Sequence, residues 1–396
     1  QSGKTILSLI LILTQIYFRN RQKLLPMHIP FHKPQIDDYE LNAVQETLKS
    51  GWLTMGPKTI EFEKKFRDFL GVKYAISCNS ATAALHLSLL ALDIDKNDEV
   101  IIPVNTFSAT AEAVIFTGAT PVLCDIDSFT HNINPELISD LITPRTKAII
   151  PVHFAGIPCD MNLILQIAKD NSLVVVEDAA HAIPSSLGGN PIGTFGTTTC
   201  FSFYATKTLT TGEGGMVTTN DSEIAEKIKI KRLHGMSGDA WNRYSEENDW
   251  FYDIVDLGYK YNTTDLQSTI GIIQLEKIHL LQKKREEIAG KYLNGFSGKL
   301  QILTPPDNVN SSWHLFVIRV NNRDDLHKYL KEKGIHTSVH FIPIHHHSYY
   351  QQKLGVNKSQ YPIANQIYGQ SLSLPIYPGL QDKEVEYIIN SVLECC

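Results

Sequence analysis

Two ionisable side chains of this 396-residue chain occupy positions where a buried site could use them. Asp178 ends the apolar run SLVVVE, and a partly buried carboxylate is costly unless a cation pairs with it. Lys207 follows in FSFYATKTLTTGEGG, between a strand-like segment and a glycine cluster. Each residue alone has an ordinary explanation, because aspartate often caps helices and loop lysines are usually solvated. Together they suggest a site that pairs a carboxylate with a reactive amine.

Two other segments carry residues suited to a flat, phosphorylated ligand. CNSATAALH places Ser80, Ala81 and Thr82 at the expected start of a helix, where free N–H groups and the helix dipole attract phosphate. Simple capping by Ser80 is the alternative, and the two roles are compatible. Phe107, in PVNTFSAT, could stack on a planar ring or fill the core.

A phosphate site, a stacking aromatic, a buried carboxylate and a lysine together match pyridoxal 5′-phosphate. The lysine forms a Schiff base with the cofactor's aldehyde, and the carboxylate keeps the ring nitrogen protonated so that the ring accepts electrons. Each feature alone is weak. Because they occur on successive strand ends, we predict a pyridoxal-phosphate site.

The elements that position these residues alternate between strand and helix. The expected strands are 73–77, 99–104, 121–126, 146–152 and 172–178. The expected helices are 80–92, 106–118, 135–142 and 161–171. Strands that read as continuous apolar runs, separated by helices, predict an α/β fold with a mainly parallel sheet between helices. Ligands of such sheets bind at the carboxyl ends of the strands.

The pattern changes after about residue 266. A long, charged helical stretch over 265–293 precedes a second strand and helix series, expected at 311–320 (strand), 324–334 (helix), 335–342 (strand) and 382–394 (helix). We therefore predict a large cofactor-binding domain over 27–265 and a smaller C-terminal α/β domain over 266–396.

Residues 1–26 differ from the rest of the chain. Their apolar run is shorter than the ~20 residues that span a bilayer, and the basic residues follow it, whereas they precede the apolar region of a secretory signal. We interpret 1–26 as an atypical N-terminal extension, upstream sequence or a remnant. A short membrane-associated helix is the alternative.

Composition excludes several classes of protein. The formal net charge of −6 and the pI of about 6.2 give no overall field that would attract nucleic acid or an anionic membrane. The six cysteines form no CxxC pair and no Cys/His cluster with metal-ligand spacing. Free thiols, a cytoplasmic location and no bound metal are therefore expected.

From Phe31 to about Leu393 the sequence resembles the DegT-type (DegT/DnrJ/StrS) sugar aminotransferases, a fold-type-I pyridoxal-phosphate family that acts on nucleotide-linked keto-sugars. The matching stretches are GWLTMGPKTIEFE, NSATAALHLSLLAL, DEVIIPVNTFSATAEAV, GATPVLCDID, TPRTKAIIPVHFAG, VVEDAAHA, FSFYATKTLTTGEGGMVTT, GYKYNTTDLQSTIGIIQL and SVHFIPIHHHSYY. IIPVHFAG, EDAAHA and GYKYN most resemble enzymes that aminate the 4-keto group of UDP-sugars, such as UDP-4-amino-4-deoxy-L-arabinose synthase.

The resemblance implies roles for individual residues. Lys207 corresponds to the Schiff-base lysine, Asp178 to the partner of the ring nitrogen, and His181 to the residue that contacts the ring hydroxyl. Phe107 takes the stacking position. Asn262 would reach the phosphate from the second subunit, although a turn residue before a helix is the simpler explanation of its spacing. The implied cofactor-binding set is Ala81, Thr82, Phe107, Asp178, His181, Ser202, Lys207 and Asn262.

The activity implied by the resemblance is transfer of an amino group from L-glutamate, which leaves 2-oxoglutarate, to the C4 keto group of a nucleotide-linked keto-sugar. The protein would be a homodimer with shared active sites and would supply an amino-sugar for a cell-surface polysaccharide or glycoconjugate. Lys207 favours transamination, because family members that act as dehydratases carry histidine at that position. A 3-keto-sugar or cyclitol aminotransferase and a non-catalytic cofactor-binding regulator are the alternatives.

Two stretches depart from the family pattern and leave the sugar open. SSLGGNPIG replaces a commoner glycine–arginine run. His345, His346 and His347 could suggest a metal site, but consecutive histidines in a strand point to opposite faces and do not form one ligand set.

Overall fold

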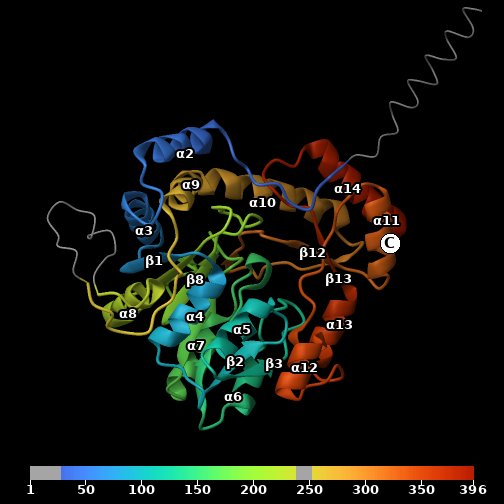
Figure 1. The fold of residues 1–396 in the computed structure, drawn as a ribbon. Coiled ribbons are helices and arrows are strands. Elements are labelled where there is room, and N and C mark those ends of the chain that lie inside the picture. Colours follow the sequence, from blue (N-terminus) through green and yellow to red (C-terminus); the bar gives the residue numbers. More distant parts are fainter. Residues whose placement is uncertain (1–27, 238–251) are drawn as a thin grey trace, which may run out of the picture.

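The computed structural model describes residues 28–237 and 252–396 (Figure 1), so the expectation for residues 1–26 lies outside the described residues. A seven-stranded sheet forms its centre. Its strands, in spatial order, are β1 (Tyr74–Cys78), β9 (Gly215–Thr219), β8 (Thr198–Ser202), β5 (Val174–Asp178), β4 (Thr146–Ile149), β2 (Glu99–Pro103) and β3 (Thr120–Cys124). Every neighbouring pair is parallel except the two pairs that β9 makes. The predicted mainly parallel sheet is confirmed.

Helices cover both faces of this sheet (Figure 1), and a separate apolar core fills each side. One face carries α4 (Ala81–Ala91), α5 (Ser108–Phe116) and α8 (Ser222–Arg232). The other carries α3 (Pro57–Leu70), α7 (Met161–Asp170) and α9 (Asp265–Glu276). The strands are buried on both sides, which explains why they read as uninterrupted apolar runs.

Local sequence sets where the helices begin. Ser80 caps α4 by accepting the N–H of Ala83 at 3.1 Å. Thr264 and Gln267 form a capping box at the start of α9. A capping box of Asp37 and Glu40 also opens α2 (Asp38–Ser50). The remaining helical segments near the sheet are η1 (Pro135–Leu137), α6 (Ile138–Leu141) and η2 (Phe154–Gly156).

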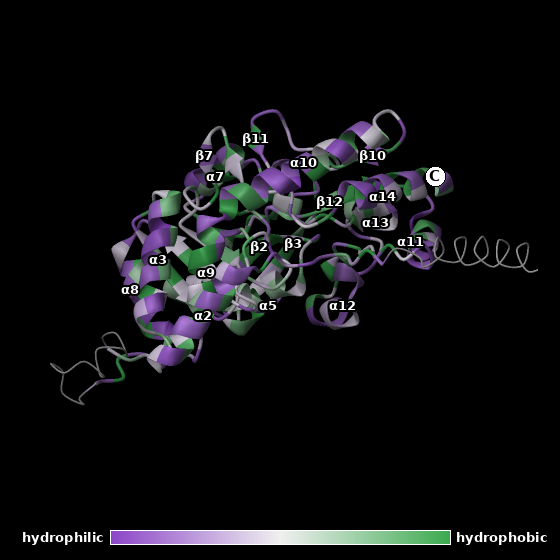
Figure 2. Ribbon diagram, turned by 90° about the horizontal axis from the view of Figure 1, so that it is seen from above, coloured by the Kyte–Doolittle hydropathy of each residue, from purple (hydrophilic) through white to green (hydrophobic). Residues whose placement is uncertain are grey.

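The C-terminal part has its own apolar core around a three-stranded antiparallel sheet. In Figure 2 this part lies on the right, beside the central sheet. Its strands are β10 (Gln301–Ile302), β12 (Phe316–Arg319) and β13 (Ser371–Leu374). Its helices are α10 (Ile278–Phe296), α11 (Arg323–Glu332), η4 (Ile344–His346), α12 (Ser348–Leu354), α13 (Pro362–Gln370) and α14 (Asp382–Cys395). A short sheet of β6 (Ser186–Leu187), β7 (Asn190–Pro191) and β11 (Val309–Asn310) joins the two parts. The domain boundary at 265/266 stays a prediction.

Two expected elements differ from the structure. The long helix expected over 265–293 is divided near Lys277 into α9, which packs on α2 and α3, and α10, which packs on α14. The strand expected over 335–342 is wrong. Only isolated bridges occur there, Ile335 with Ile29 and Ser338 with Ser373, and the chain then leaves the sheet. Its apolar alternation reflects contacts with several neighbours and not a strand ladder.

No helix of the described ranges, 28–237 and 252–396, is long and apolar enough to cross a membrane. All six cysteines lie in these ranges, and none forms a disulfide.

Candidate active site

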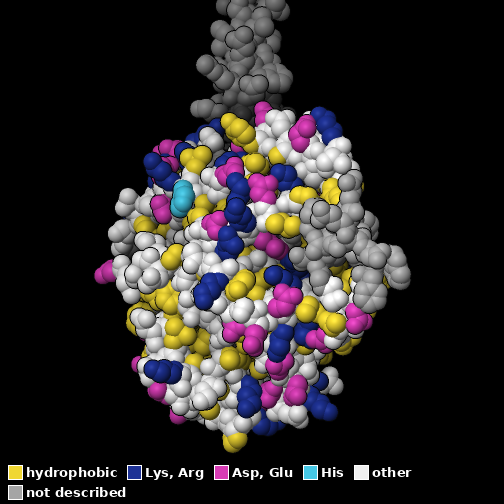
Figure 3. Space-filling model, turned by 90° about the vertical axis from the view of Figure 1, so that its left-hand side faces the viewer, with side chains coloured by type: hydrophobic (Ala, Val, Ile, Leu, Met, Phe, Trp, Pro, Cys, Tyr) yellow, Lys and Arg dark blue, Asp and Glu magenta, His cyan; other side chains and the backbone are white. Residues whose placement is uncertain are grey.

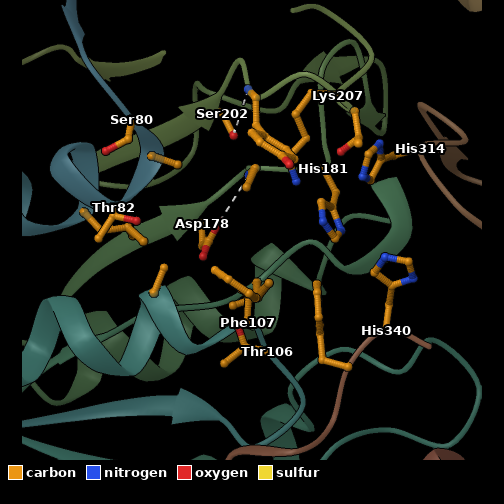
Figure 4. Close-up of a pocket in the computed structure, with 18 of the residues that line it drawn as sticks. Ser80, Thr82, Thr106, Phe107, Asp178, His181, Ser202, Lys207, His314 and His340 are labelled. Carbon is orange, nitrogen blue, oxygen red and sulfur yellow. Dashed lines mark hydrogen bonds between the residues drawn. The ribbon is translucent and has the colours of Figure 1, made fainter. Parts of the chain in front are cut away.

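A cavity of about 320 Å³ opens at the carboxyl ends of the parallel strands, and it contains the predicted carboxylate and lysine (Figure 4). Loops from both parts of the chain surround it. The residues that line it are Ser80, Ala81, Thr82, Leu85, Thr106, Phe107, Ala109, Val152, Asp178, Ala180, His181, Ser202, Tyr204, Thr206, Lys207, Glu213, Gly214, His314, His340 and Phe341. Its volume is within the ~300–1,000 Å³ of small-molecule sites.

Asp178 is the last residue of β5 and only 6% exposed. Thr110 on α5 donates its hydroxyl to Asp178 Oδ2 at 2.8 Å, and the N–H of Ala180 donates to Oδ1 at 3.1 Å. Burial raises the pKa of Asp178, while these two hydrogen bonds and the nearby Lys207 oppose the shift. A cation placed against this carboxylate would favour its ionised form.

Lys207 lies in the turn after β8, and its side chain reaches into the same cavity (Figure 4). Phe201 and Phe203 anchor this segment, since both are buried against Phe66 on α3. Burial lowers the pKa of Lys207 to about 8, and the Asp178 carboxylate opposes the shift. Burial therefore makes the neutral form of this amine more accessible near physiological pH than that of an exposed lysine, and a nucleophile or base must be neutral.

The phosphate end of the cavity, as we call it, consists of Ser80, Ala81, Thr82 and Ser202. Ala81 and Thr82 form the first turn of α4, so their N–H groups have no partner within the helix. Gly215 on β9 makes room for this turn, because a Cβ atom there would lie 2.4 Å from the carbonyl oxygen of Ser80. A helix N-terminus that packs closely against a strand at a glycine is a suitable anion site.

The histidine end, as we call it, consists of His181, His314 and His340 and lies across the cavity from the phosphate end (Figure 4). The rings of His181 and His314 are 4.3 Å apart. Burial is the main cause that lowers the pKa of each ring, to about 4 for His340, and Lys207 adds to the effect. All three are therefore neutral hydrogen-bonding groups near pH 7.

His181 is fixed in one tautomer by the backbone. The N–H of Ala155 donates to His181 Nδ1 at 3.3 Å, so that nitrogen carries no proton. The neutral ring must then carry its proton on Nε2. His181 thus offers a donor toward a ligand in the cavity.

Phe107 and Asn262 have different positions relative to the cavity. Phe107 lines it and is 60% exposed, so its ring is available for stacking. Asn262 does not line it. The Asn262 side chain donates to the carbonyl of Thr263 at 2.9 Å, and its buried Oδ1 has no hydrogen-bond partner among the described residues. A contact of Asn262 with the phosphate of another subunit stays a prediction.

Sequence reasoning missed several residues of the site. Thr110 holds Asp178 from α5, and Glu213 and Phe341 line the cavity. His314 and His340 were assigned no role. For His314 the sequence does carry a signal, because it lies in the largely apolar segment SSWHLFVIRV. A buried polar side chain is costly unless a hydrogen bond satisfies it, so its presence there indicates a role.

The three consecutive histidines are not in a strand, so the expectation of alternating faces is wrong. His345 and His346 lie in the short helical turn η4, and the Nε2 atoms of both contact Asn365 Oδ1, at 3.0 and 2.6 Å. Across the described residues, no group of three or more His, Cys, Asp or Glu side chains is arranged to hold a metal ion.

Comparison with known proteins agrees with this geometry. The model of the DegT/DnrJ/EryC1/StrS aminotransferase family matches residues 34–393. The spore coat polysaccharide biosynthesis protein SpsC of Bacillus subtilis is 48% identical over 373 residues, which cover 92% of this chain and 96% of SpsC.

Two solved structures are similar over most of their length. One is Spr1654 of Streptococcus pneumoniae, described as a sugar aminotransferase and solved in its PLP form, with a TM-score of 0.88 and 34% identity over 93% of this chain and 98% of that one. The other is PseC of Helicobacter pylori, an aminotransferase involved in the biosynthesis of pseudoaminic acid, with a TM-score of 0.87 and 33% identity over 93% of this chain and 99% of that one.

The chain belongs to the DegT/DnrJ/EryC1/StrS aminotransferase family. The predicted family, its enzyme class and its fold-type-I α/β architecture are confirmed.

Proposed function

We propose that this aminotransferase moves an amino group from L-glutamate to the C4 keto group of a nucleotide-linked keto-sugar. Pyridoxal 5′-phosphate is the cofactor, as predicted. One observation supports the proposal above others: Lys207, Asp178 and the phosphate end all face one cavity of suitable size. The sugar part rests on relatives named for spore coat polysaccharide and pseudoaminic acid biosynthesis.

The residues present fit the cofactor. The first turn of α4, with the space that Gly215 leaves beside it, would hold the phosphate together with Ser202. Asp178 would bind the ring nitrogen, and Phe107 would stack on the ring. The bound cofactor supplies a carbonyl that exchanges amino groups and a ring that withdraws electrons from the adjacent carbon.

Lys207 has two functions in this proposal: it anchors the cofactor through its amine and then transfers protons. Its lowered pKa would let the neutral amine take a proton from the α-carbon of the donor and give it back later in the same half-reaction. Arginine could not do this, because it keeps its proton. Asp178 would stay ionised, because a cationic ring nitrogen beside it would favour the charged carboxylate.

His314 and His340 of the histidine end are the proposed contacts for the substrate, whereas His181 is the proposed contact for the ring oxygen of the cofactor. The neutral imidazoles of His314 and His340 suit hydroxyl and carbonyl oxygens of a sugar, and they add no fixed charge beside Lys207.

We further propose a cytoplasmic homodimer in which Asn262 completes the partner's phosphate site. Figure 3 shows apolar side chains among charged ones on the face that carries α3. Several large apolar side chains on α2, on α3, in the loop between them and in the 252–257 segment are exposed: Leu41, Leu48, Leu53, Ile60, Ile254, Val255 and Leu257. Exposed apolar groups in such numbers are typical of a protein interface.

The experiment is a two-stage absorbance assay. Glutamate alone should convert the cofactor to its amino form, and a panel of nucleotide-linked 4-keto- and 3-keto-sugars should then restore it. Restoration by 4-keto-sugars supports the proposal, whereas restoration by 3-keto-sugars alone would contradict the C4 assignment. No change with any donor would favour a regulator.

A further inference from the structure

Directly behind Asp178 lies a pair of buried side chains that the proposed mechanism does not use. Neighbouring residues of a strand point to opposite faces, so Glu177 faces away from the cavity that Asp178 faces. Glu177 and His153 are both 0% exposed, and Glu177 Oε2 lies 3.0 Å from His153 Nε2. A buried carboxylate is costly unless its oxygens are fully satisfied.

The hydrogen bonds fix the protonation of this pair. Glu177 Oε1 accepts the N–H of Gly196 at 2.7 Å and the hydroxyl of Thr199 at 2.6 Å. His153 Nδ1 accepts the N–H of Cys159 at 3.1 Å, so the neutral ring carries its proton on Nε2 and donates it to Glu177. The carboxylate thus receives three donors, and His153 has one permitted tautomer.

Asn132 and the pair together hold the loop that follows β4. The N–H of Phe154 donates to Asn132 Oδ1 at 2.9 Å, and Asn132 Nδ2 donates to the carbonyl of Ile157 at 3.0 Å. Between these contacts Ala155 adopts a left-handed backbone with φ of 58°, which residues other than glycine rarely adopt. His153 is the side chain that connects this loop to β5.

The loop acts on the active site through one hydrogen bond. Ala155 donates its N–H to His181 Nδ1, which sets the tautomer of His181. The titratable groups that share the cavity with His181 are Asp178, Tyr204, Lys207, Glu213, His314 and His340. The backbone N–H of His153 also donates to the carbonyl of Asp178 at 3.1 Å.

We propose that Glu177 and His153 are positioning residues that keep the proton of His181 on Nε2, directed at the ring oxygen of the cofactor. The inference rests on the proposed function. A hydrogen bond donated to that oxygen would favour its ionised form. The proton shared between the oxygen and the Lys207 nitrogen would then dissociate at a lower pH. Without it, the bound cofactor keeps this proton to higher pH.

The test is a pH titration of the visible absorbance of the cofactor-loaded protein, without substrate. In Glu177→Gln the amide cannot accept all three donors, so the loop loosens. The titration midpoint should rise by about one pH unit. His153→Leu should shift it in the same direction, while His153→Gln, whose amide can still donate to Glu177, should restore the wild-type midpoint. Thr199→Val, which removes one donor without changing side-chain shape, should give a smaller rise.

Glu99→Gln is the matched control. Glu99 is also buried, at the amino end of β2, and accepts the hydroxyl of Thr143 at 2.6 Å. It should keep the wild-type midpoint. Loaded variants of Glu177, His153 and Thr199 that all titrate like the wild type would overturn the inference and leave the proposed function intact. A wild-type protein that binds no cofactor would overturn the proposed function and, with it, this inference.

Discussion

The two ends of the cavity are built differently. The phosphate end is local, because three of its four residues are consecutive at the start of α4. The histidine end collects one residue after β5, one before β12 and one before η4, which are far apart in sequence. A short motif is enough to form an anion site, whereas the histidine end forms only when both parts of the chain have folded together.

The ends also differ in electrostatics. The phosphate end uses backbone N–H groups and the helix dipole, whose charge does not depend on pH. The histidine end uses imidazoles that burial keeps neutral. Lys207, whose amine gains and loses a proton in the proposed mechanism, and Asp178, whose carboxylate stays ionised there, lie between them. Substitutions should therefore separate into effects on chemistry, on cofactor binding and on substrate binding.

The largest effect is expected at Lys207. Lys207→Ala removes both the anchor and the proton carrier, so turnover should fall by about 10⁴-fold or more. Steady-state assays with glutamate and the accepted sugar measure it. Lys169→Ala, at an exposed position on α7, is the control and should behave like the wild type. Comparable turnover in the two variants would contradict the assignment.

Asp178→Asn should slow the chemistry and leave the cofactor bound. An amide is uncharged and cannot stabilise a cationic ring nitrogen, so the glutamate half-reaction should slow by about 10²–10³-fold. Stopped-flow absorbance follows this step. If the half-reaction keeps its wild-type rate while the cofactor is bound, the role of Asp178 is wrong.

Gly215→Ala tests the phosphate end alone. The added methyl group would meet the carbonyl of Ser80 at 2.4 Å and displace the first turn of α4, so the dissociation constant of the cofactor should rise at least about tenfold. Equilibrium dialysis of the apoprotein measures it. Gly290→Ala on α10, where a Cβ atom meets nothing within 4 Å, is the control and should leave the dissociation constant of the cofactor unchanged. Equal affinities would show that this turn does not bind the phosphate.

His340→Ala tests the histidine end alone, and its effect should be the smallest. Loss of one hydrogen bond to the substrate should raise a substrate KM about tenfold and leave the cofactor's dissociation constant unchanged. His279→Ala, at an exposed position, is the control. A change in cofactor affinity with no change in KM would contradict the proposal that His340 contacts the substrate and not the cofactor.

The sequence predicted the central sheet well for a physical reason. Strands buried on both faces must be apolar throughout, and this pattern is visible without tertiary information. Asp178 and Lys207 could be placed because Asp178 ends such a strand and Lys207 lies in the turn that follows another. Ser80, Ala81 and Thr82 followed from helix capping.

What could not be predicted depends on distant contacts. His340 reaches the cavity because the chain leaves the small sheet after Ser338, so the strand expected there was wrong. Thr110 contacts Asp178 only because the fold brings the first turn of α5 to the carboxyl end of β5. The histidines of η4 form a helical turn that their sequence alone does not indicate.

The central claim is that Lys207 holds the cofactor covalently. Borohydride reduction of the loaded protein, followed by proteolysis and mass spectrometry, should find the reduced cofactor on the peptide that contains Lys207 and on no other lysine. Recovery of unmodified Lys207 after reduction, or of the cofactor on a different lysine, would contradict the account.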